Sequence, residues 1–236
     1  MDIPTKFLSI EPPLNTIIKH FIWRRHPFLP EMELFALPAI NNDIKKQLQA
    51  QDHSWQWPYI WECGIGLARW ILDNPNVVKD KIVYDLGTGQ GTVAIAAKMA
   101  GAKISIGIDT CVYSDFVLTV NSERNKVQTL GYNTTLFKAK IADKSIVFAS
   151  DVVYGQSSSS SIMDKFVDLS KESTVIISQS GRTNPSYDII DPRFLLLQEY
   201  MISTLTPGLE NVETIPVRLY YVAEYYDDQK EESVTP

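Results

Sequence analysis

The sequence contains few of the residues that bind metal ions or form disulfides. Of its 236 residues, two are cysteines (Cys63 and Cys111) and three are histidines (His20, His26 and His53). The cysteines lie too far apart in the sequence to form a metal-binding or redox motif, and the histidines do not have the spacing of metal ligands. We therefore expect no metal site, no structural disulfide and a protein that works in a reducing compartment.

Long apolar runs and an excess of basic residues are missing as well. No apolar stretch approaches the roughly 18 residues of a membrane-spanning helix, and the first six residues do not resemble a signal peptide. A net charge of −6 and a pI of about 5.1 disfavour general binding to nucleic acid. The basic cluster at 19–26 is interpreted as a solvated helix face. We expect a soluble monomer without nucleic-acid or membrane partners, in the cytoplasm, or in the mitochondrial matrix if the source is eukaryotic.

The sequence also lacks the Gly-x-Ser-x-Gly nucleophile elbow of serine hydrolases. The nearest stretch, Ser178-Gln179-Ser180-Gly181, does not have the first glycine. The composition, 44% hydrophobic and 21% charged, is ordinary for a globular protein, and the chain is long enough to bury a full core. The chemistry of the protein therefore has to be sought in another motif.

A glycine-rich segment follows the first predicted strand of an α/β pattern. The strand at 81–86 continues into Gly87-Thr88-Gly89-Gln90-Gly91, after which an alanine-rich helix begins. Because glycine has no Cβ, the chain can turn sharply here and a ligand can lie against its backbone. The next strand, at 103–108, is followed by Asp109, a carboxylate placed to accept both hydroxyls of a ribose. This layout predicts a site for a cofactor that contains a nucleoside.

The spacing of the glycines distinguishes between such cofactors. A dinucleotide-binding loop has the pattern Gly-x-Gly-x-x-Gly and leaves a helix amino terminus free for a pyrophosphate. In this sequence the third glycine comes one residue earlier, and Asp85 precedes the loop. That carboxylate would repel a pyrophosphate but attract an ammonium group, and S-adenosylmethionine has an ammonium, a ribose and no phosphate. The pattern favours S-adenosylmethionine; a nicotinamide or flavin dinucleotide and a glycine turn without a ligand are the alternatives. The residues expected to bind the cofactor are Asp85, Gly87, Thr88, Gly89, Gly91 and Asp109.

Strand and helix patterns alternate along most of the chain. We expect strands at 81–86, 103–108, 134–139, 145–150 and 173–179, and helices at 91–100, 113–126, 161–170 and 192–205. Such alternation predicts a mostly parallel sheet with helices on both faces. The last apolar stretches, 212–216 and 218–225, are joined too tightly for a crossover helix and should form an antiparallel hairpin at one edge. The predicted fold is α/β: a Rossmann-like, doubly wound sheet of seven strands.

The segment before the glycine loop is expected to contain accessory elements. Helical patterns cover 13–26 and 41–51, and 27–38 is an extended stretch interrupted by prolines. The pattern at 55–73 predicts a helix with a buried apolar stripe. We expect an accessory segment at 1–54, a cofactor-binding domain at 55–226 and an acidic, disordered tail at 227–236.

Motifs outside the glycine loop resemble those of a known family. They are Leu29 to Leu34, the aromatic-rich Pro58 to Pro75, Asn121 and Asn125 at Asn-x-x-x-Asn spacing, Asp151-Val152-Val153-Tyr154, and Gly181-Arg182. In this order they resemble the class I, seven-β-strand S-adenosylmethionine-dependent methyltransferases, and among them the protein lysine methyltransferases of the methyltransferase-like family. The likeness covers about residues 28 to 225 and is strongest to the group that acts on the β subunit of electron transfer flavoprotein.

The resemblance implies that 55–226 is a class I methyltransferase domain whose acceptor is a lysine of a protein substrate. The β subunit of electron transfer flavoprotein is one candidate. Asp151 would bind and orient the lysine ammonium, and Tyr154 would form one wall of the methyl pocket. In the alternative interpretation, Asp151 is a helix N-cap and Tyr154 is an aromatic residue of the interior. A small-molecule methyltransferase, or a non-catalytic cofactor- or protein-binding module of the same fold, is the alternative function.

Three further cofactor-binding residues are expected from the same resemblance. Trp61 would pack on the cofactor or in the core. Asp143 would accept the adenine amino group or serve as a turn residue, and Ser150 would line the adenine pocket with its backbone. The sequence departs from its relatives at Trp61-Glu62-Cys63-Gly64, where they have a Pro-Gly-Gly-like or Ala-Gly-Gly-like turn. It also has a run of five serines at 157–161, interpreted as a lip beside the substrate or a linker.

Overall fold

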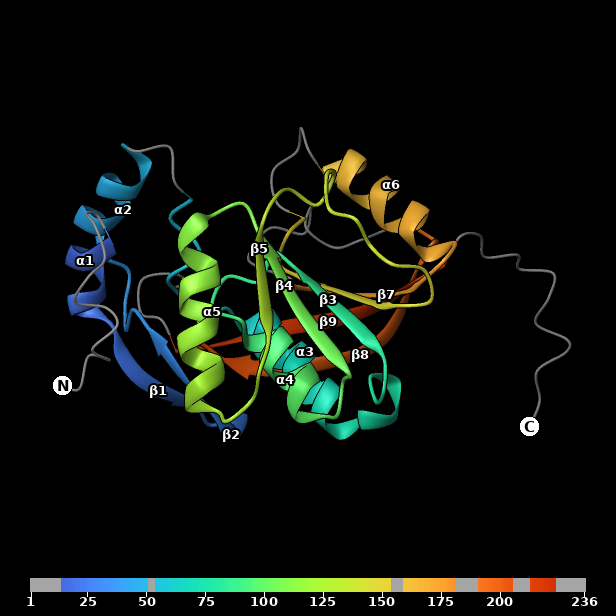
Figure 1. The fold of residues 1–236 in the computed structure, drawn as a ribbon, viewed down its shortest axis with the longest axis horizontal. Helices are drawn as coiled ribbons and strands as arrows, with labels where there is room; N and C mark the ends of the chain where they lie inside the picture. Colours follow the sequence, from blue (N-terminus) through green and yellow to red (C-terminus); the bar gives the residue numbers. More distant parts are fainter. Residues whose placement is uncertain (1–13, 51–53, 154–158, 181–190, 206–212, 224–236) are drawn as a thin grey trace, which may run out of the picture.

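The computed structural model describes residues 14–50, 54–153, 159–180, 191–205 and 213–223. A seven-stranded sheet with the order β5-β4-β3-β6-β7-β9-β8 lies at its centre (Figure 1). Five strands are parallel, and β9 and β8 run antiparallel at one edge. The strands are β3 (Ile82–Leu86), β4 (Ile104–Asp109), β5 (Leu130–Asn133), β6 (Ile146–Ser150), β7 (Thr174–Ser180), β8 (Phe194–Ser203) and β9 (Thr214–Val222). The predicted fold class is confirmed.

Helices cover both faces of this sheet. One face packs against α3 (Glu62–Asp73), α4 (Thr92–Met99) and α5 (Val112–Arg124), and the other against α6 (Ser159–Ser170). Alternate residues of the central strand β3 contribute to the two sides, since Val83 is buried beneath α3 and α4 whereas Tyr84 and Leu86 belong to the core beneath α6. Burial on both faces explains why the central strands are nearly continuous apolar runs. A short 3-10 helix, η3 (Pro75–Val77), follows α3.

The two C-terminal strands differ from the sequence prediction. The segment predicted as a helix at 192–205 forms β8, and the two stretches predicted as a hairpin form the single strand β9. Leu, Gln, Glu and Met in β8 favour helix, but pairing with β9 overrides this preference. Pro216 does not break β9: it is paired with Met201 of β8, and the ladder between β9 and β7 ends one residue later at Val217, so no residue of β7 needs its missing N–H. The antiparallel edge hairpin is therefore β8–β9.

The N-terminal segment forms a small sheet where one long helix was predicted. After α1 (Leu14–Ile17) and η2 (Ile18–His20), the strands β1 (Ile22–His26) and β2 (Leu29–Ala36) pair antiparallel. The basic cluster therefore lies largely in a strand, and its interpretation as a helix face was wrong. Arg24 donates hydrogen bonds to the carbonyls of Pro38 (3.0 Å) and Leu205 (2.7 Å). The predicted polar helix is confirmed as α2 (Asn42–Gln49), capped by the side chain of Asn41.

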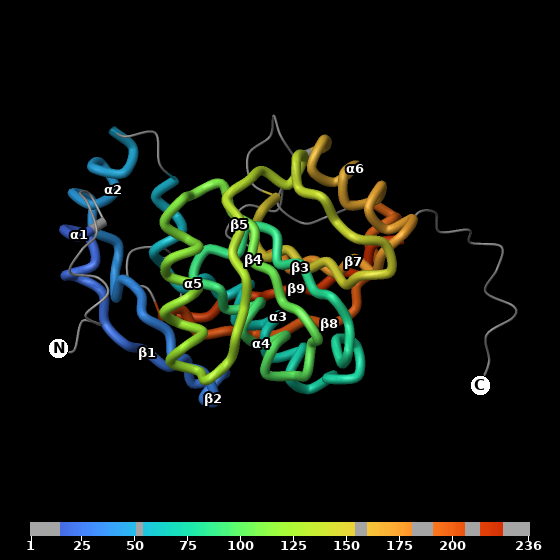
Figure 2. The backbone as a smooth tube through the Cα atoms, in the orientation of Figure 1, coloured from blue at the N-terminus to red at the C-terminus, as the bar shows by residue number. Residues whose placement is uncertain are grey.

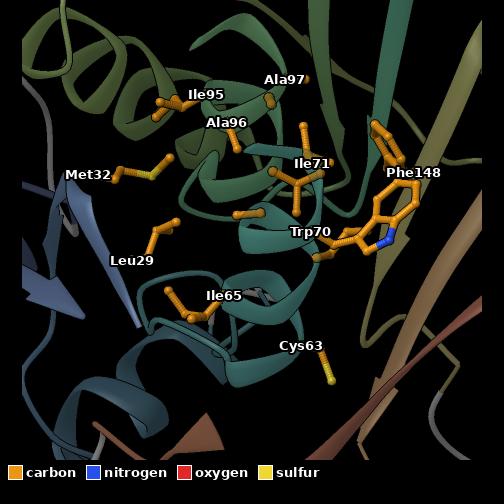
Figure 3. Packing of buried hydrophobic residues seen from close by; sticks show 14 of the residues in the cluster. Leu29, Met32, Cys63, Ile65, Trp70, Ile71, Ile95, Ala96, Ala97 and Phe148 are labelled. Atoms are coloured by element: carbon orange, nitrogen blue, oxygen red, sulfur yellow. The ribbon is translucent and has the colours of Figure 1, made fainter. Parts of the chain in front are cut away.

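The N-terminal strands share a core with the sheet. Leu29 and Met32 of β2 are buried together with Ile65 of α3 and Ile95 of α4, as Figure 3 shows. The backbone trace shows β1 and β2 running beside α5 (Figure 2). The boundary at residue 54 stays a prediction, as does the tail at 227–236, which lies outside the described residues. Among the helices of the described ranges, none has the length and apolar character needed to cross a membrane.

Candidate functional site

The carboxyl ends of β3, β4 and β6 open into a cavity of about 390 Å³. Its residues come from five places: the stretch before α3, the glycine loop after β3, the ends of β4 and β5, the end of β6 with the segment after it, and Ile162 of α6. Ligands of doubly wound sheets bind outside the carboxyl ends of the strands, and the cavity has the size of a cofactor site. This position is the one predicted from the sequence.

The glycine loop has the conformation that its composition predicts. Gly87, Gly89 and Gly91 have φ values of 76°, 48° and 85°, a region that side chains with a Cβ rarely adopt. A Cβ on Gly87 would lie 2.5 Å from Cγ1 of Val152. Gly87 and Gly89 line the cavity, whereas Gly91 begins α4 and faces the side chain of Leu118. The first two glycines therefore leave bare backbone toward a ligand, and the third permits close packing behind the loop.

Asp109 lines the cavity at the end of β4 and is held by two backbone amides. Its Oδ2 accepts from the amide of Gly89 (2.9 Å) and its Oδ1 from the amide of Cys111 (2.9 Å). Burial raises the pKa of the Asp109 carboxyl above its ordinary value, whereas these hydrogen bonds lower it. A carboxylate oxygen has more than one acceptor site. Asp109 could therefore accept ribose hydroxyls while keeping the contact with the loop.

Asp85, which precedes the glycine loop, and Thr88, which lies within it, are both buried and do not line the cavity. The Oδ2 of Asp85 accepts from the Thr88 hydroxyl (2.7 Å) and from the amide of Ala94 in the first turn of α4 (3.1 Å). Its Oδ1 is buried without a hydrogen-bond partner among the described residues. Burial raises the pKa of Asp85 to about 7. The bonds of Asp85 hold the loop against α4, and the expectation that Asp85 and Thr88 contact the cofactor stays a prediction.

An aromatic wall faces the glycine loop. Trp55, Trp57 and Trp61 all line the cavity, and the rings of Trp55 and Trp61 meet edge to face at 6.4 Å. The Trp61 indole N–H donates to the carbonyl of Gln56 (2.9 Å), and the Gln90 side-chain amide donates to the carbonyl of Trp57 (3.0 Å). Trp61 thus both lines the cavity and packs against neighbouring aromatics. Sequence reasoning overlooked Trp55 and Trp57, although they belong to the same aromatic-rich entry as Trp61.

Ser150 ends β6, Asp151 and Val152 follow it, and all three line the cavity. Asp151 has a φ of 56°, and its amide donates to the carbonyl of Ser178 in β7 (2.9 Å). Because α6 begins at Ser159, Asp151 is not its N-cap. The structure therefore brings Asp151 and Ser150 to the glycine loop as predicted. Tyr154 and the Gly181-Arg182 pair lie outside the described residues, and the last three serines of the serine run begin α6.

Asp143 is the predicted site residue that the structure places elsewhere. It is exposed in the turn that leads into β6, at the amino end of that strand, and it does not line the cavity. The corresponding wall is formed by Thr134 and Leu136, which follow β5. The prediction failed because the third strand was placed at 134–139, whereas β5 ends at Asn133. A strand end at 133 would have directed attention to the residues immediately after it.

Comparison with known sequences supports a common origin with lysine-modifying enzymes. A family model described as lysine methyltransferase matches residues 44–191. The human electron transfer flavoprotein beta subunit lysine methyltransferase is 44% identical over 71 residues, 30% of this chain and 27% of that protein. The Xenopus laevis protein of the same name is 28% identical over 150 residues, 60% of this chain and 58% of its own length. A Schizosaccharomyces pombe protein N-terminal and lysine N-methyltransferase is 33% identical over 105 residues, 41% of this chain and 40% of its own.

Solved structures share the fold at low sequence identity. The tRNA (uracil-54, C5)-methyltransferase of Pyrococcus abyssi, in complex with S-adenosyl-L-homocysteine, matches 86% of this chain and 44% of its own at 14% identity, with a TM-score of 0.53. The magnesium protoporphyrin IX methyltransferase of Synechocystis PCC 6803, with bound S-adenosylhomocysteine, matches 68% of this chain and 82% of its own at 14% identity, with a TM-score of 0.50. These likenesses concern the fold alone. From the family model, which spans well over half of the sequence, we conclude that the chain belongs to the lysine methyltransferase family, whose methyl donor is S-adenosylmethionine.

Proposed function

We propose that this protein transfers a methyl group from S-adenosylmethionine to the side-chain amine of a lysine in a protein substrate. S-adenosylmethionine supplies a methyl group activated by an adjacent sulfonium. The observation that carries the proposal is the cavity itself, which is lined by Gly87, Gly89 and Asp109 and also by Asp151. One set of residues suits the donor, and the other suits a cationic acceptor.

The residues of the cavity fit the proposed donor. Gly87 and Gly89 present backbone without side chains, and Asp109 presents a fixed carboxylate for ribose hydroxyls. Ile108 and Leu136 add apolar surface suited to a flat purine ring. The amino end of α4, which begins at Thr92 after the N-cap Gly91, does not line the cavity. This arrangement suits an adenosine without phosphates better than a dinucleotide.

Asp151 is proposed to bind and orient the acceptor. A lysine ammonium has an ordinary pKa of about 10.4 and must lose a proton before its nitrogen can attack. The Asp151 carboxylate stabilises the ammonium form, whereas the sulfonium charge and desolvation in an aromatic-lined cavity favour the neutral amine. We therefore assign most of the acceleration to positioning, because displacement requires a near-attack arrangement more than a strong base. Tyr154 is proposed to bound the methyl pocket.

The β subunit of electron transfer flavoprotein is the proposed acceptor protein. The support comes from the names of the human and Xenopus laevis relatives. The alignments with this chain cover 27% of the length of the human protein and 58% of the length of the Xenopus laevis protein. We propose a cytoplasmic or mitochondrial matrix location on the same basis, because the enzyme has to meet its substrate. A monomeric state stays a prediction.

Incubation with methyl-labelled S-adenosylmethionine tests the proposal. The purified protein is mixed with purified β subunit of electron transfer flavoprotein and, separately, with lysate from the source. We expect label on a protein and, after digestion, mass spectra that locate it on lysine. Label found only in small metabolites would favour the small-molecule alternative. A calorimetric titration with S-adenosylhomocysteine that gives no heat would instead favour a module without the cofactor.

A further inference from the structure

Three polar side chains follow one another in the buried end of β7. Ser178, Gln179 and Ser180 are 1%, 5% and 0% exposed, and they directly follow the apolar residues Val175–Ile177. Polar side chains are costly in such a position unless they form hydrogen bonds. Their partners therefore indicate why polar residues are present at this point of the strand.

Ser178 and Gln179 connect β7 to both sides of the cavity. The Ser178 hydroxyl donates to the carbonyl of Cys63 in the first turn of α3 (3.0 Å), two residues after Trp61. The backbone carbonyl of Ser178 accepts the amide of Asp151 (2.9 Å). The side-chain amide of Gln179 donates to the carbonyl of Val153 (3.3 Å). Residues 151–153 are therefore tied to β7 at both ends.

The segment 151–153 lies just beyond the end of the parallel sheet ladder. The ladder between β6 and β7 ends at the pair Ser150 and Ser178, so the chain leaves the sheet at Asp151. Asp151 itself has a left-handed backbone, which is strained for a residue with a Cβ. Such a conformation persists only where surrounding contacts determine it. The Gln179 hydrogen bond supplies one of these contacts.

Gln179 uses only part of its hydrogen-bonding capacity. Its Oε1 is buried and has no partner among the described residues. An unsatisfied buried acceptor destabilises a folded protein, so this amide is a poor choice if packing alone determined the residue. The hydrogen bond that the side-chain amide donates to the carbonyl of Val153 explains why a glutamine is present at this position.

We propose that Gln179 is a positioning residue for methyl transfer. Its side-chain amide fixes the backbone of 151–153, and thereby the direction of the Asp151 carboxylate toward the acceptor. The inference rests on the proposed function, since Asp151 is assigned there to the acceptor lysine. Gln179 itself does not line the cavity.

Replacement by an apolar side chain of similar length separates positioning from stability. Gln179→Met removes the unsatisfied Oε1 but leaves the Val153 carbonyl without its donor. These two effects oppose each other, so we expect the melting temperature to stay close to that of the wild type. The kcat for protein methylation should fall by about ten- to a hundred-fold, because small misplacements of reacting groups are costly. Affinity for S-adenosylhomocysteine, measured by calorimetry, should stay within about two-fold, because Asp109 and the glycine loop are untouched.

Ser145→Ala provides a matched control. Ser145 is buried and its hydroxyl pairs with that of Ser173 (3.1 Å) at the opposite ends of the same two strands. This variant should keep kcat close to the wild-type value. A Gln179→Met protein with wild-type kcat, or one whose lost activity accompanies an equally lowered melting temperature, would overturn the inference.

Amide hydrogen exchange gives a readout that does not depend on the acceptor. In Gln179→Met the amides of 151–153 should exchange at least about five-fold faster, as expected for loss of one hydrogen bond, with the rest of β7 unchanged. Unchanged exchange there would refute the role of Gln179. A wild-type enzyme that binds S-adenosylhomocysteine but methylates no protein would refute only the proposed function.

Discussion

The two carboxylates that line the cavity are held in different ways. Asp109 accepts a backbone amide on each of its oxygens, so its side chain has a fixed direction. Asp151 is held through its own backbone amide, in a left-handed conformation. A fixed carboxylate suits the constant ribose of a cofactor, and Asp151 is the residue proposed to bind the acceptor. Substitutions at the two positions should therefore have separable effects.

Replacing Asp151 tests its role in methyl transfer. Asn tolerates the left-handed backbone and keeps the shape of the side chain, so Asp151→Asn should fold normally. Loss of the charge that orients the acceptor should reduce kcat/KM by about a hundred-fold or more, measured with labelled S-adenosylmethionine. Asp80→Asn is the matched control, because Asp80 also has a positive φ, of 62°, but lies exposed before β3. Full activity of Asp151→Asn would remove this residue from the reaction.

Replacing Asp109 tests its role in cofactor binding. Asp109→Ala removes the proposed ribose contacts and releases the amides of Gly89 and Cys111. Charge-assisted hydrogen bonds contribute about 1.5–3 kcal/mol each, so the Kd for S-adenosylhomocysteine should rise about a hundred-fold or more. The comparison is Asp143→Ala, at the exposed turn outside the cavity, which should bind like the wild type. Equal affinities in calorimetry would contradict the assignment of Asp109.

At the scale of elements, α5 connects the glycine loop with the N-terminal strands. The Asn121 side chain donates to the carbonyl of Gln90 (2.9 Å) and accepts the amide of Phe35 in β2 (2.7 Å). One turn later, the Asn125 side chain accepts the amide of Glu33 (2.9 Å). The Asn-x-x-x-Asn spacing noticed in the sequence is thus a structural feature, in which one helix satisfies the backbone of an edge strand and of the loop.

The contact between α5 and the loop depends on Gly107 in β4. A Cβ at this position would lie 2.7 Å from both the Thr88 hydroxyl oxygen and Cδ2 of Leu118. Gly107→Ala should therefore lower the free energy of unfolding by about 1–3 kcal/mol and weaken cofactor binding, because the loop has to move. Gly64→Ala in α3 is the control: its new Cβ would meet Ser150 Oγ at 3.6 Å, an ordinary contact. Denaturant unfolding that gives both variants equal stability would contradict this packing argument.

The elements that the sequence predicted well are those whose own pattern matches their surroundings. The central strands β3, β4, β6 and β7 are apolar runs buried on both faces, and they lie close to their predicted positions. The extended stretch predicted at 27–38 contains β2, whereas β1 and β8 were predicted as helix, because their pairing partners determine their conformation more than local preference does. The candidate site followed the same rule. Glycine positions and Asp109 were predictable from spacing. Thr134 and Leu136 required the correct end of β5, and Trp55 required the packing of the stretch before α3.

At the scale of the whole molecule, the N-terminal strands are joined to the far edge of the sheet. His26 contacts the carbonyl of Ser203 through its Nε2 (2.8 Å), and Phe28 packs edge to face on Tyr200 of β8 at 5.3 Å. The strands β1 and β2 therefore touch both α5 and β8. Stability and the shape of the site should respond together to changes in this network.

Asp85 makes the stability of the whole molecule depend on pH. The pKa of this carboxyl is about 7 in the folded protein, against an ordinary value of 3.8, because burial disfavours its charged form. Between these two pH values the folded state binds more protons than the unfolded state. The contribution of Asp85 to the free energy of unfolding is therefore complete below pH 3.8 and is lost as the pH rises toward 7. Asp85→Asn removes this titration but keeps an acceptor for Thr88 and Ala94. The melting temperature of the variant relative to wild type should rise by at least about 4 °C from pH 4 to pH 7.5 and level off above. A difference that stays constant across this range would show that Asp85 is ionised in the folded protein as it is in the unfolded chain.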